Sequence, residues 1–193
     1  KLFEVCRLRD IPIMTFINKM DREARDPFEL LDEIASKLAL DPAPLYWPAG
    51  SGSRFKGIVD LKGERFLPFS RQPKEVAHGE PVALNSNAIV QHLEPAEQEE
   101  AMEGAMLVQE ASKPFDPQSF LEGHMTPVFF GSALRGFGVR ELLEGLASYA
   151  PPPVTVAVRR GGEETHVAPG DPEVSGFVFK VQANMDPNHR DRI

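Results

Sequence analysis

The chain has 193 residues, of which 41% are hydrophobic and 26% are charged, proportions that are ordinary for a globular protein with a core of its own. Its formal charge of −8 argues against a non-specific nucleic-acid binder, and against DNA as a partner, because such proteins normally carry a basic face. The single cysteine excludes an internal disulfide and offers no metal-ligand spacing, and no apolar run approaches the ~20 residues of a membrane helix, so we expect a cytoplasmic protein without a membrane partner.

The start and the end of the sequence look internal. KLFEVCRLRDIPIM is typical of the second half of a helix that runs straight into a strand, and HRDRI follows a strand and a charged turn. We therefore expect a piece of a longer protein. Within the first stretch, residues 11–17 form a short apolar run, which predicts a buried strand of a mostly parallel sheet.

A helix is expected after this strand. Asp26 can serve as its N-cap, Pro27 suits the first helical position, and Glu29 stands three residues after the cap. Apolar residues then recur on one face, and the Asp-Pro pair at 41–42 is expected to end the helix. The apolar face consists of Leu30, Leu31, Ile34, Ala35 and Leu38.

The middle of the chain has a different pattern. Between residues 45 and 69, β-branched and aromatic residues alternate with polar ones around a Lys62-Gly63 turn, which predicts a β-hairpin. From about residue 95 to 113, an acidic first turn precedes apolar residues at helical spacing, which predicts a helix. Its apolar side is expected to hold Ala101, Met102, Ala105, Met106 and Val108. We interpret this part as a small α+β insertion.

The strand-turn-helix pattern then returns. MTPVFF is an apolar strand, GSAL is a turn, and a helix with apolar residues at spacings of three and four follows it. Its apolar residues are Val139, Leu142, Leu143, Leu146 and Ala150. Prolines 151–153 stop this helix, the polar stretch to Pro172 is typical of a linker, and a strand of a new domain is expected to begin near Ser175.

Two polar loops follow the predicted parallel strands, at the edge where α/β sheets bind ligands. In the first loop, Asp21 can accept two hydrogen bonds from the N1–H and the exocyclic amine of guanine, an edge that adenine lacks. Asn18 can donate to the guanine oxygen or ring nitrogen and can also tie neighbouring loops together, while the stem of Lys19 can lie against the base.

The second loop is Gly131-Ser132-Ala133-Leu134. Its small side chains let the backbone approach a base, so that the Ala133 N–H can reach the guanine carbonyl oxygen. A site of this kind rejects an analogue that lacks the matching groups by ~10⁴ or more. The tetrapeptide Asn-Lys-x-Asp alone is weak support, since it occurs by chance in a few per cent of chains of this length, and the paired strand-loop-helix context strengthens it.

The loops NKMD and GSAL resemble the two base-recognition loops of translational GTPases, and the segment between them resembles the extra subdomain of elongation factor G. TFINKMDREARDPFELLDEI, PVFFGSALRGFGV and GFVFKVQANMDPNHRDRI are most similar to the release factor three family, the class II peptide chain release factors of bacteria. Elongation factor G resembles the first two stretches only loosely and departs from the third.

The resemblance implies that Asn18, Lys19 and Asp21 hold the guanine of GTP or GDP and that Ser132, Ala133 and Leu134 form the second base loop. It also implies an α/β fold: the C-terminal part of a P-loop GTPase (G) domain with an α+β insertion, followed by the start of a β-barrel domain. The implied ranges are 1–44 and 121–150 for the G domain, 45–120 for the insertion, and 151–193 for the linker and barrel start.

No Gly-x-x-x-x-Gly-Lys-Ser/Thr motif occurs in the sequence, so we expect the phosphate loop, the Mg²⁺ site and the switch residues only in a full-length protein. We assign no catalytic residue and no metal ligand here. Two or three charge-assisted hydrogen bonds of ~1.5–3 kcal/mol each barely offset an association cost of at least ~4 kcal/mol. We therefore expect this chain alone to bind guanine nucleotide negligibly and to hydrolyse none.

By family resemblance, the full-length protein is expected to be a ribosome-dependent GTPase of translation termination, which uses GTP to promote release and recycling of class I release factors. The ribosome, the class I factors and a guanine nucleotide would be its partners. Two alternatives stay open within the enzyme class, an elongation factor G-like translocase and a ribosomal protection protein. A third, of another class, is a non-catalytic ribosome-binding module that kept the base loops.

Overall fold

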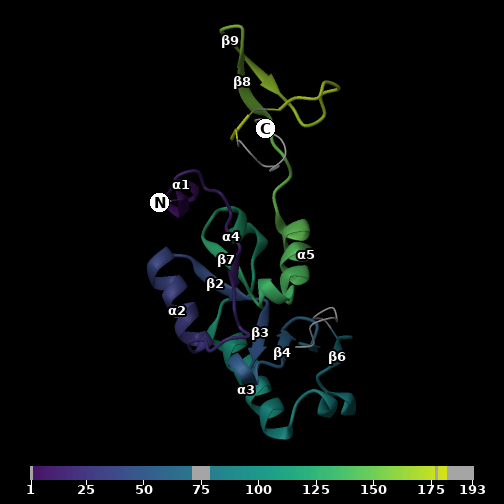
Figure 1. Ribbon diagram of the computed structural model, residues 1–193. Helices are drawn as coiled ribbons and strands as arrows, with labels where there is room; N and C mark the ends of the chain where they lie inside the picture. The colour runs from purple at the N-terminus through teal and green to yellow at the C-terminus, as the bar shows by residue number, and fades with distance from the viewer. Residues whose placement is uncertain (1, 71–78, 177, 182–193) are drawn as a thin grey trace. The chain divides into compact units, whose positions relative to one another are not determined.

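The computed structural model describes residues 2–70, 79–176 and 178–181. The chain divides into two compact units, Lys1–Ala150 and Pro151–Ile193, and each is described by itself (Figure 1). The first unit begins with the short helix α1 (Leu2–Arg7) and carries a second short helix, α4 (Pro117–Leu121), before its last strand. Within the described ranges, no helix is long and apolar enough to cross a membrane.

A parallel sheet of three strands holds the two predicted loops. Strand β7 (Met125–Phe130) is central and pairs with β1 (Thr15–Ile17) on one side and β2 (Asp41–Pro44) on the other. Every residue of β7 is buried, as its apolar run predicted. The strand expected over residues 11–17 is shorter than predicted and only half-buried, because β1 is an edge strand of the described sheet.

Strand β2 is an element that the sequence pattern did not predict. The helix before it ends at Leu38, with Ala39 in the left-handed conformation (φ 51°), and residues 41–44 then turn into the sheet rather than ending the helix. Pro42 and Pro44 argue against a central strand because proline cannot donate to the ladder. At the edge of the sheet, beside β7 alone, both prolines are tolerated.

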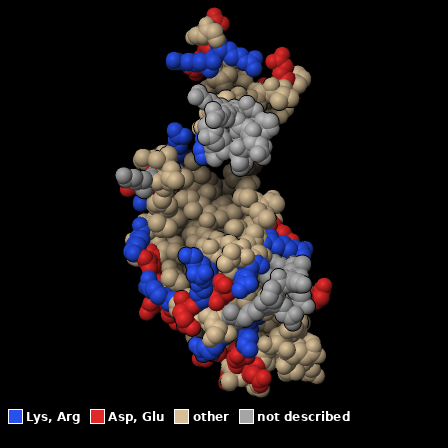
Figure 2. Space-filling view, viewed as in Figure 1, with Lys and Arg blue, Asp and Glu red and all other residues tan. Residues whose placement is uncertain are grey.

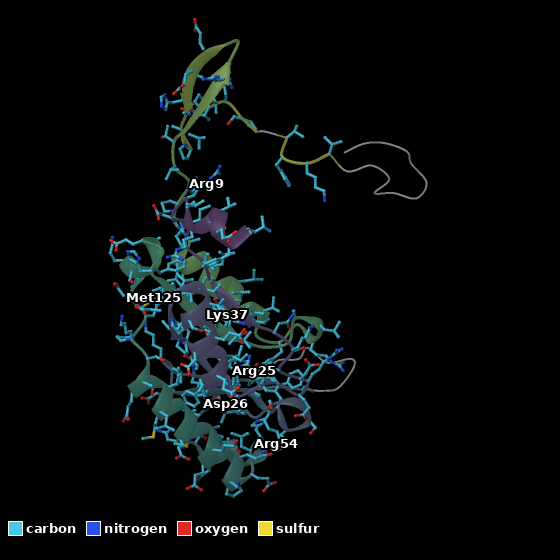
Figure 3. All side chains as sticks on the ribbon, turned by 90° about the vertical axis from the view of Figure 1, so that its left-hand side faces the viewer. Arg9, Arg25, Asp26, Lys37, Arg54 and Met125 are labelled. Atoms are coloured by element: carbon cyan, nitrogen blue, oxygen red, sulfur yellow. The ribbon has the colours of Figure 1, made fainter. Side chains whose placement is uncertain are left out.

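Helix α2 (Pro27–Leu38) begins at the predicted cap. The Asp26 carboxylate accepts hydrogen bonds from the backbone N–H groups of Phe28 and Glu29 (2.7 and 3.3 Å). The reciprocal bond of a capping box is not part of this cap, and the Glu29 carboxylate pairs with Arg25 at 3.3 Å. Figure 3 shows Arg25 and Asp26 together at one end of the helix, with Lys37 further along it.

An ion-pair chain runs along the exposed side of α2. Lys37 and Arg25 both donate hydrogen bonds to the Glu33 carboxylate, which lies between them on the helix surface. These bonds, that from Lys37 first, hold the pKa of Glu33 below its ordinary value. The chain is exposed, so its main consequence is local support of the helix rather than a large share of the fold's stability.

A four-stranded antiparallel sheet lies between β2 and β7 in sequence. Its strands are β3 (Tyr46–Ala49), β4 (Gly57–Asp60), β5 (Arg65–Pro68) and β6 (Val82–Ala83). The hairpin predicted around Lys62-Gly63 is confirmed as β4–β5. Its turn is held by the Asp60 side chain, which accepts from the N–H groups of Lys62 and Gly63 (3.2 and 2.8 Å) and pairs with Arg65 at 2.7 Å.

Helix α3 (Pro95–Ala111) is confirmed, but its buried face is narrower than predicted. Ala101, Ala105 and Val108 are buried, whereas Met102 and Met106 are 36% and 60% exposed. With about 3.6 residues per turn, Met102 lies roughly 60° and Met106 roughly 100° around the helix from Ala105, the nearest residue of the buried stripe. The expectation that they share its face was therefore wrong.

One hydrophobic core joins α2, the antiparallel sheet and β7. Trp47 of β3 lies with its ring centroid 4.6 Å from that of Phe28 and 5.8 Å from that of Phe130. Gly104 of α3 lets this indole approach, since a Cβ there would lie 2.3 Å from Trp47 Nε1. The range 45–120 thus shares its core with the flanking ranges, and the domain boundaries given above stay predictions.

Helix α5 (Val139–Tyr149) packs on the other face of β7, and Figure 1 shows α2 and α5 on opposite sides of the sheet. Its close approach depends on Gly145, where a Cβ would lie 2.5 Å from Phe129 Cζ. The predicted apolar side of α5 is largely uncovered, with Leu143 57% and Leu146 48% exposed.

On the face shown in Figure 2, charged side chains gather below a hollowed surface that carries few of them.

The second unit contains a hairpin where the sequence pattern predicted a linker. Strands β8 (Val156–Arg160) and β9 (Glu163–Val167) form an antiparallel hairpin inside the range expected to be unstructured, with Gly161 and Gly162 at its turn (φ +60° and +94°). The expected start of a β-barrel is not confirmed, since residues 178–181 have no regular structure. Residues 177 and 182–193, which hold most of the stretch GFVFKVQANMDPNHRDRI, lie outside the described residues.

Removing the N-cap of α2 tests the local account of this helix. Asp26→Ala leaves two backbone N–H groups without their acceptor, and we expect the free energy of unfolding to fall by about 1 kcal/mol. Urea denaturation of the chain measures the change. Asp32→Ala, at an exposed position inside the same helix, is the matched control, and equal destabilisation by both variants would contradict the capping role.

Candidate functional site

The two predicted loops lie side by side because the strands that precede them are neighbours. In the parallel pairing of β1 with β7, Ile17 stands opposite Phe130, and each loop starts one residue later. The backbone continues the pairing beyond the strands: the Gly131 N–H donates to Ile17 O and the Met20 N–H donates to Gly131 O, both at 3.0 Å. The loops therefore emerge at one edge of the sheet, the edge where such sheets bind ligands.

Asn18 links the loops with a single side-chain oxygen. Its Oδ1 accepts a hydrogen bond from the N–H of Lys19 at 2.8 Å and another from the N–H of Ala133 at 2.9 Å. The first bond shapes its own loop, and the second reaches a residue 115 positions away. The Ala133 N–H, predicted to donate to a base carbonyl, is therefore engaged by Asn18 in this structure.

Met20 anchors the first loop in the core. The Met20 side chain is fully buried in the main core, whereas Lys19 is exposed. Lys19 has a left-handed backbone (φ 71°), a conformation that costs a non-glycine residue roughly 1–2 kcal/mol. The side chain of Asp21 is only 11% exposed, and its nearest cation is Arg135, whose Nε lies 4.0 Å from Asp21 Oδ2.

A tight backbone turn closes the second loop. Ser132 exchanges two hydrogen bonds with Phe137 (2.9 and 3.0 Å), and residues Ala133–Arg135 form one 3₁₀ turn between them. Gly131 is required at the start, because a Cβ there would lie 2.3 Å from Phe137 O. Leu134 is 80% exposed. Ser132 is buried, and its Oγ has no hydrogen-bond partner among the described residues.

The structure thus brings the first and second loops into contact through Asn18 and Ala133 and places Asp21, Lys19, Ser132 and Leu134 around that contact. The arrangement suits a planar group that offers two adjacent donors to one carboxylate. It contains no nucleophile paired with a base, and no group of three or more His, Cys, Asp or Glu side chains in the described ranges could hold a metal ion.

Sequence reasoning missed two features of the site. Arg135 faces Asp21, although nothing in the sequence distinguishes it from any other exposed arginine after a loop. The loop between β3 and β4 also contacts the site, where the Gly52 N–H donates to Met20 O at 3.0 Å. The glycine spacing in GSGSR was the only signal, and it does not say which loop the glycines contact.

Comparisons with known proteins show which family the chain resembles. Residues 1–152 match the family described as the elongation factor Tu GTP-binding domain. Over its whole length the chain is 48% identical to proteins named Peptide chain release factor 3 from Aromatoleum aromaticum and from Staphylococcus haemolyticus, and it spans 35% and 36% of their lengths. The resemblance to release factor three that the motifs indicated is confirmed.

A solved structure supports the fold. A crystal structure of a protein from Thermus thermophilus matches 77% of this chain with a TM-score of 0.52, and the match covers 24% of that protein. The two sequences are 18% identical over the match, so the likeness concerns the fold alone. The predicted α/β class and GTPase-type domain are confirmed.

The link between the loops can be tested without a ligand. Asn18→Ala removes the acceptor of the Ala133 N–H, and we expect that amide to exchange with solvent about fivefold faster, the effect of losing one hydrogen bond of about 1 kcal/mol. Asn18→Asp keeps an oxygen in place and is expected to retain most of the protection. Amide exchange followed by NMR would contradict the link if Ala133 exchanged equally fast in all three proteins.

Proposed function

The chain belongs to the elongation factor Tu GTP-binding domain family, and from that premise we propose that it is the guanine-recognising part of a ribosome-dependent GTPase of translation termination. The observation that carries the proposal is the Asn18–Ala133 hydrogen bond, which joins the two base loops. The relatives at 48% identity support the termination step, since they are named Peptide chain release factor 3.

Base recognition would rest on the six loop residues. The Asp21 carboxylate would accept the N1–H and the exocyclic amine of guanine, and the exposed Lys19 and Leu134 side chains would border the ring. The Ala133 N–H would donate to the base carbonyl in one of two ways. Either its hydrogen bond to Asn18 Oδ1 breaks, or it forms a bifurcated hydrogen bond to both oxygens. The buried Ser132 Oγ, which has no partner in the described part of the chain, is a polar atom ready to join this network.

Phosphate binding and hydrolysis are proposed for residues outside this sequence. The 193 residues hold no phosphate-loop motif, and in the described ranges no side-chain cluster fits a metal ion, so we assign no step to Mg²⁺ here. We further propose that the chain by itself is inactive, because the base supplies only a few hydrogen bonds against the cost of association.

In the longer protein, the bound GTP would promote departure of class I release factors from the ribosome in the cytoplasm. The ribosome and the class I factors are therefore the proposed partners, together with the guanine nucleotide. The chain spans about a third of the length of its curated relatives, so these partners are proposals for a protein of which this sequence is one part.

Base selection can be tested by changing one carboxylate into an amide. In the gene product that contains this sequence, Asp21→Asn should weaken GDP binding at least about a hundredfold, because two charge-assisted hydrogen bonds are lost. Binding of xanthosine diphosphate should improve, since the C2 carbonyl of xanthine accepts from the new amide. Calorimetric titration measures both, with Asp32→Asn as control. Unchanged GDP affinity would contradict the assignment.

The termination step is tested on ribosomes. A labelled class I release factor is loaded after peptide release, the gene product that contains this sequence is added with GTP, and the label is followed. We expect the label to dissociate faster than in buffer, and Asp21→Ala to abolish this effect. Label that stays bound while messenger and transfer RNA advance would show a translocase instead.

A further inference from the structure

The loop between β3 and β4, residues 50–56, contacts the backbone of the first base loop. The Gly52 N–H donates to Met20 O at 3.0 Å, while the Met20 N–H donates to Gly131 O at the same distance. Both backbone polar groups of Met20 are therefore held, each by a different loop. Because Asp21 follows directly, its position depends on these two bonds.

The same loop also packs against Phe137, the residue that closes the second base loop. Phe55 is buried, and its ring meets that of Phe137 edge-on, with the centroids 5.6 Å apart. Phe137 is the residue that exchanges two backbone hydrogen bonds with Ser132. One short loop thus contacts the backbone of the first base loop and the aromatic residue that closes the second. Arg54, labelled in Figure 3, is one of the two exposed residues between these two contacts.

The contact with Met20 requires a glycine. Gly52 has a φ of +58°, in the left-handed region that side chains disfavour. A Cβ at this position would lie 2.5 Å from Glu23 Oε1 and 3.2 Å from the Glu23 backbone nitrogen. Glu23 stands two residues after Asp21, so a side chain at position 52 would push against the segment that carries the recognising carboxylate.

We propose that Gly52 is a positioning residue for guanine selection, acting through Met20 on Asp21, with Phe55 supporting the second loop. The proposal rests on the proposed function, since it assumes that Asp21 binds the base. It gives the predicted insertion, residues 45–120, a role in nucleotide selection: its first loop holds the guanine-recognition loop in place.

The test compares GDP with inosine diphosphate, which lacks the exocyclic amine, in the gene product that contains this sequence. The ratio of the two affinities reports how well Asp21 is placed. Gly52→Val should force the backbone out of the left-handed region. We expect the ratio of GDP affinity to inosine diphosphate affinity to fall about tenfold, which corresponds to the loss of one well-formed hydrogen bond to a charged group. Gly52→Ala should lower this ratio less, and it replaces Gly52→Val in the test if the valine variant does not fold.

Gly123→Val is the matched control. Gly123 also has a positive φ (+76°), but among the described residues outside its immediate neighbours only Asp10 Cα lies within 4 Å of an added Cβ, at 3.9 Å. The Gly123→Val variant should therefore have a lower thermal stability and an unchanged ratio of affinities. If the folded Gly52 variants keep the full ratio, or lose the affinities for both nucleotides equally, the positioning role is wrong. If the unchanged protein does not distinguish the two nucleotides, the proposed function itself fails.

Discussion

The parallel pairing of β1 with β7 is the constraint on which the site depends. It places Ile17 opposite Phe130, and the backbone bonds between Met20, Gly131 and Ile17 continue the register beyond the strands. Two loops that are far apart in the sequence thereby start at the same edge, close enough for Asn18 Oδ1 to accept from the Ala133 N–H. A one-residue shift of this register would move every side chain of β1 to the other face and separate the loops.

The burial of one side chain offsets the backbone strain of the first loop. A left-handed Lys19 costs roughly 1–2 kcal/mol, whereas the complete burial of Met20 contributes about 1.5–3 kcal/mol. Anchoring Met20 in the core therefore offsets the strain beside it and leaves Lys19 in solvent. The same core contains Phe55 and Trp47 of the antiparallel segment, so that segment stabilises the loop as well as touching it.

The sequence predicted those elements whose signal is local. The start of α2 follows from Asp26 and Pro27, and the burial of β7 follows from an unbroken apolar run. Strand β2 was missed because its prolines argue against a strand unless its edge position is known, and Met102 was misplaced because spacing alone does not give the width of a buried face. Arg135 and Gly52 reach the site through long-range contacts, and no local pattern reports them.

The pairing of Asp21 with Arg135 is weak enough for a base to replace. Their charged atoms are 4.0 Å apart and the arginine side chain is 45% exposed, so the pair is worth at most about 1 kcal/mol. Two hydrogen bonds from a base to the carboxylate are worth about 1.5–3 kcal/mol each. The carboxylate, with only 11% of its side chain exposed, has few water molecules to lose when such a ligand arrives. If Asp21 reads guanine as proposed, Arg135 partly compensates its charge in the absence of the base without competing effectively once the base is bound.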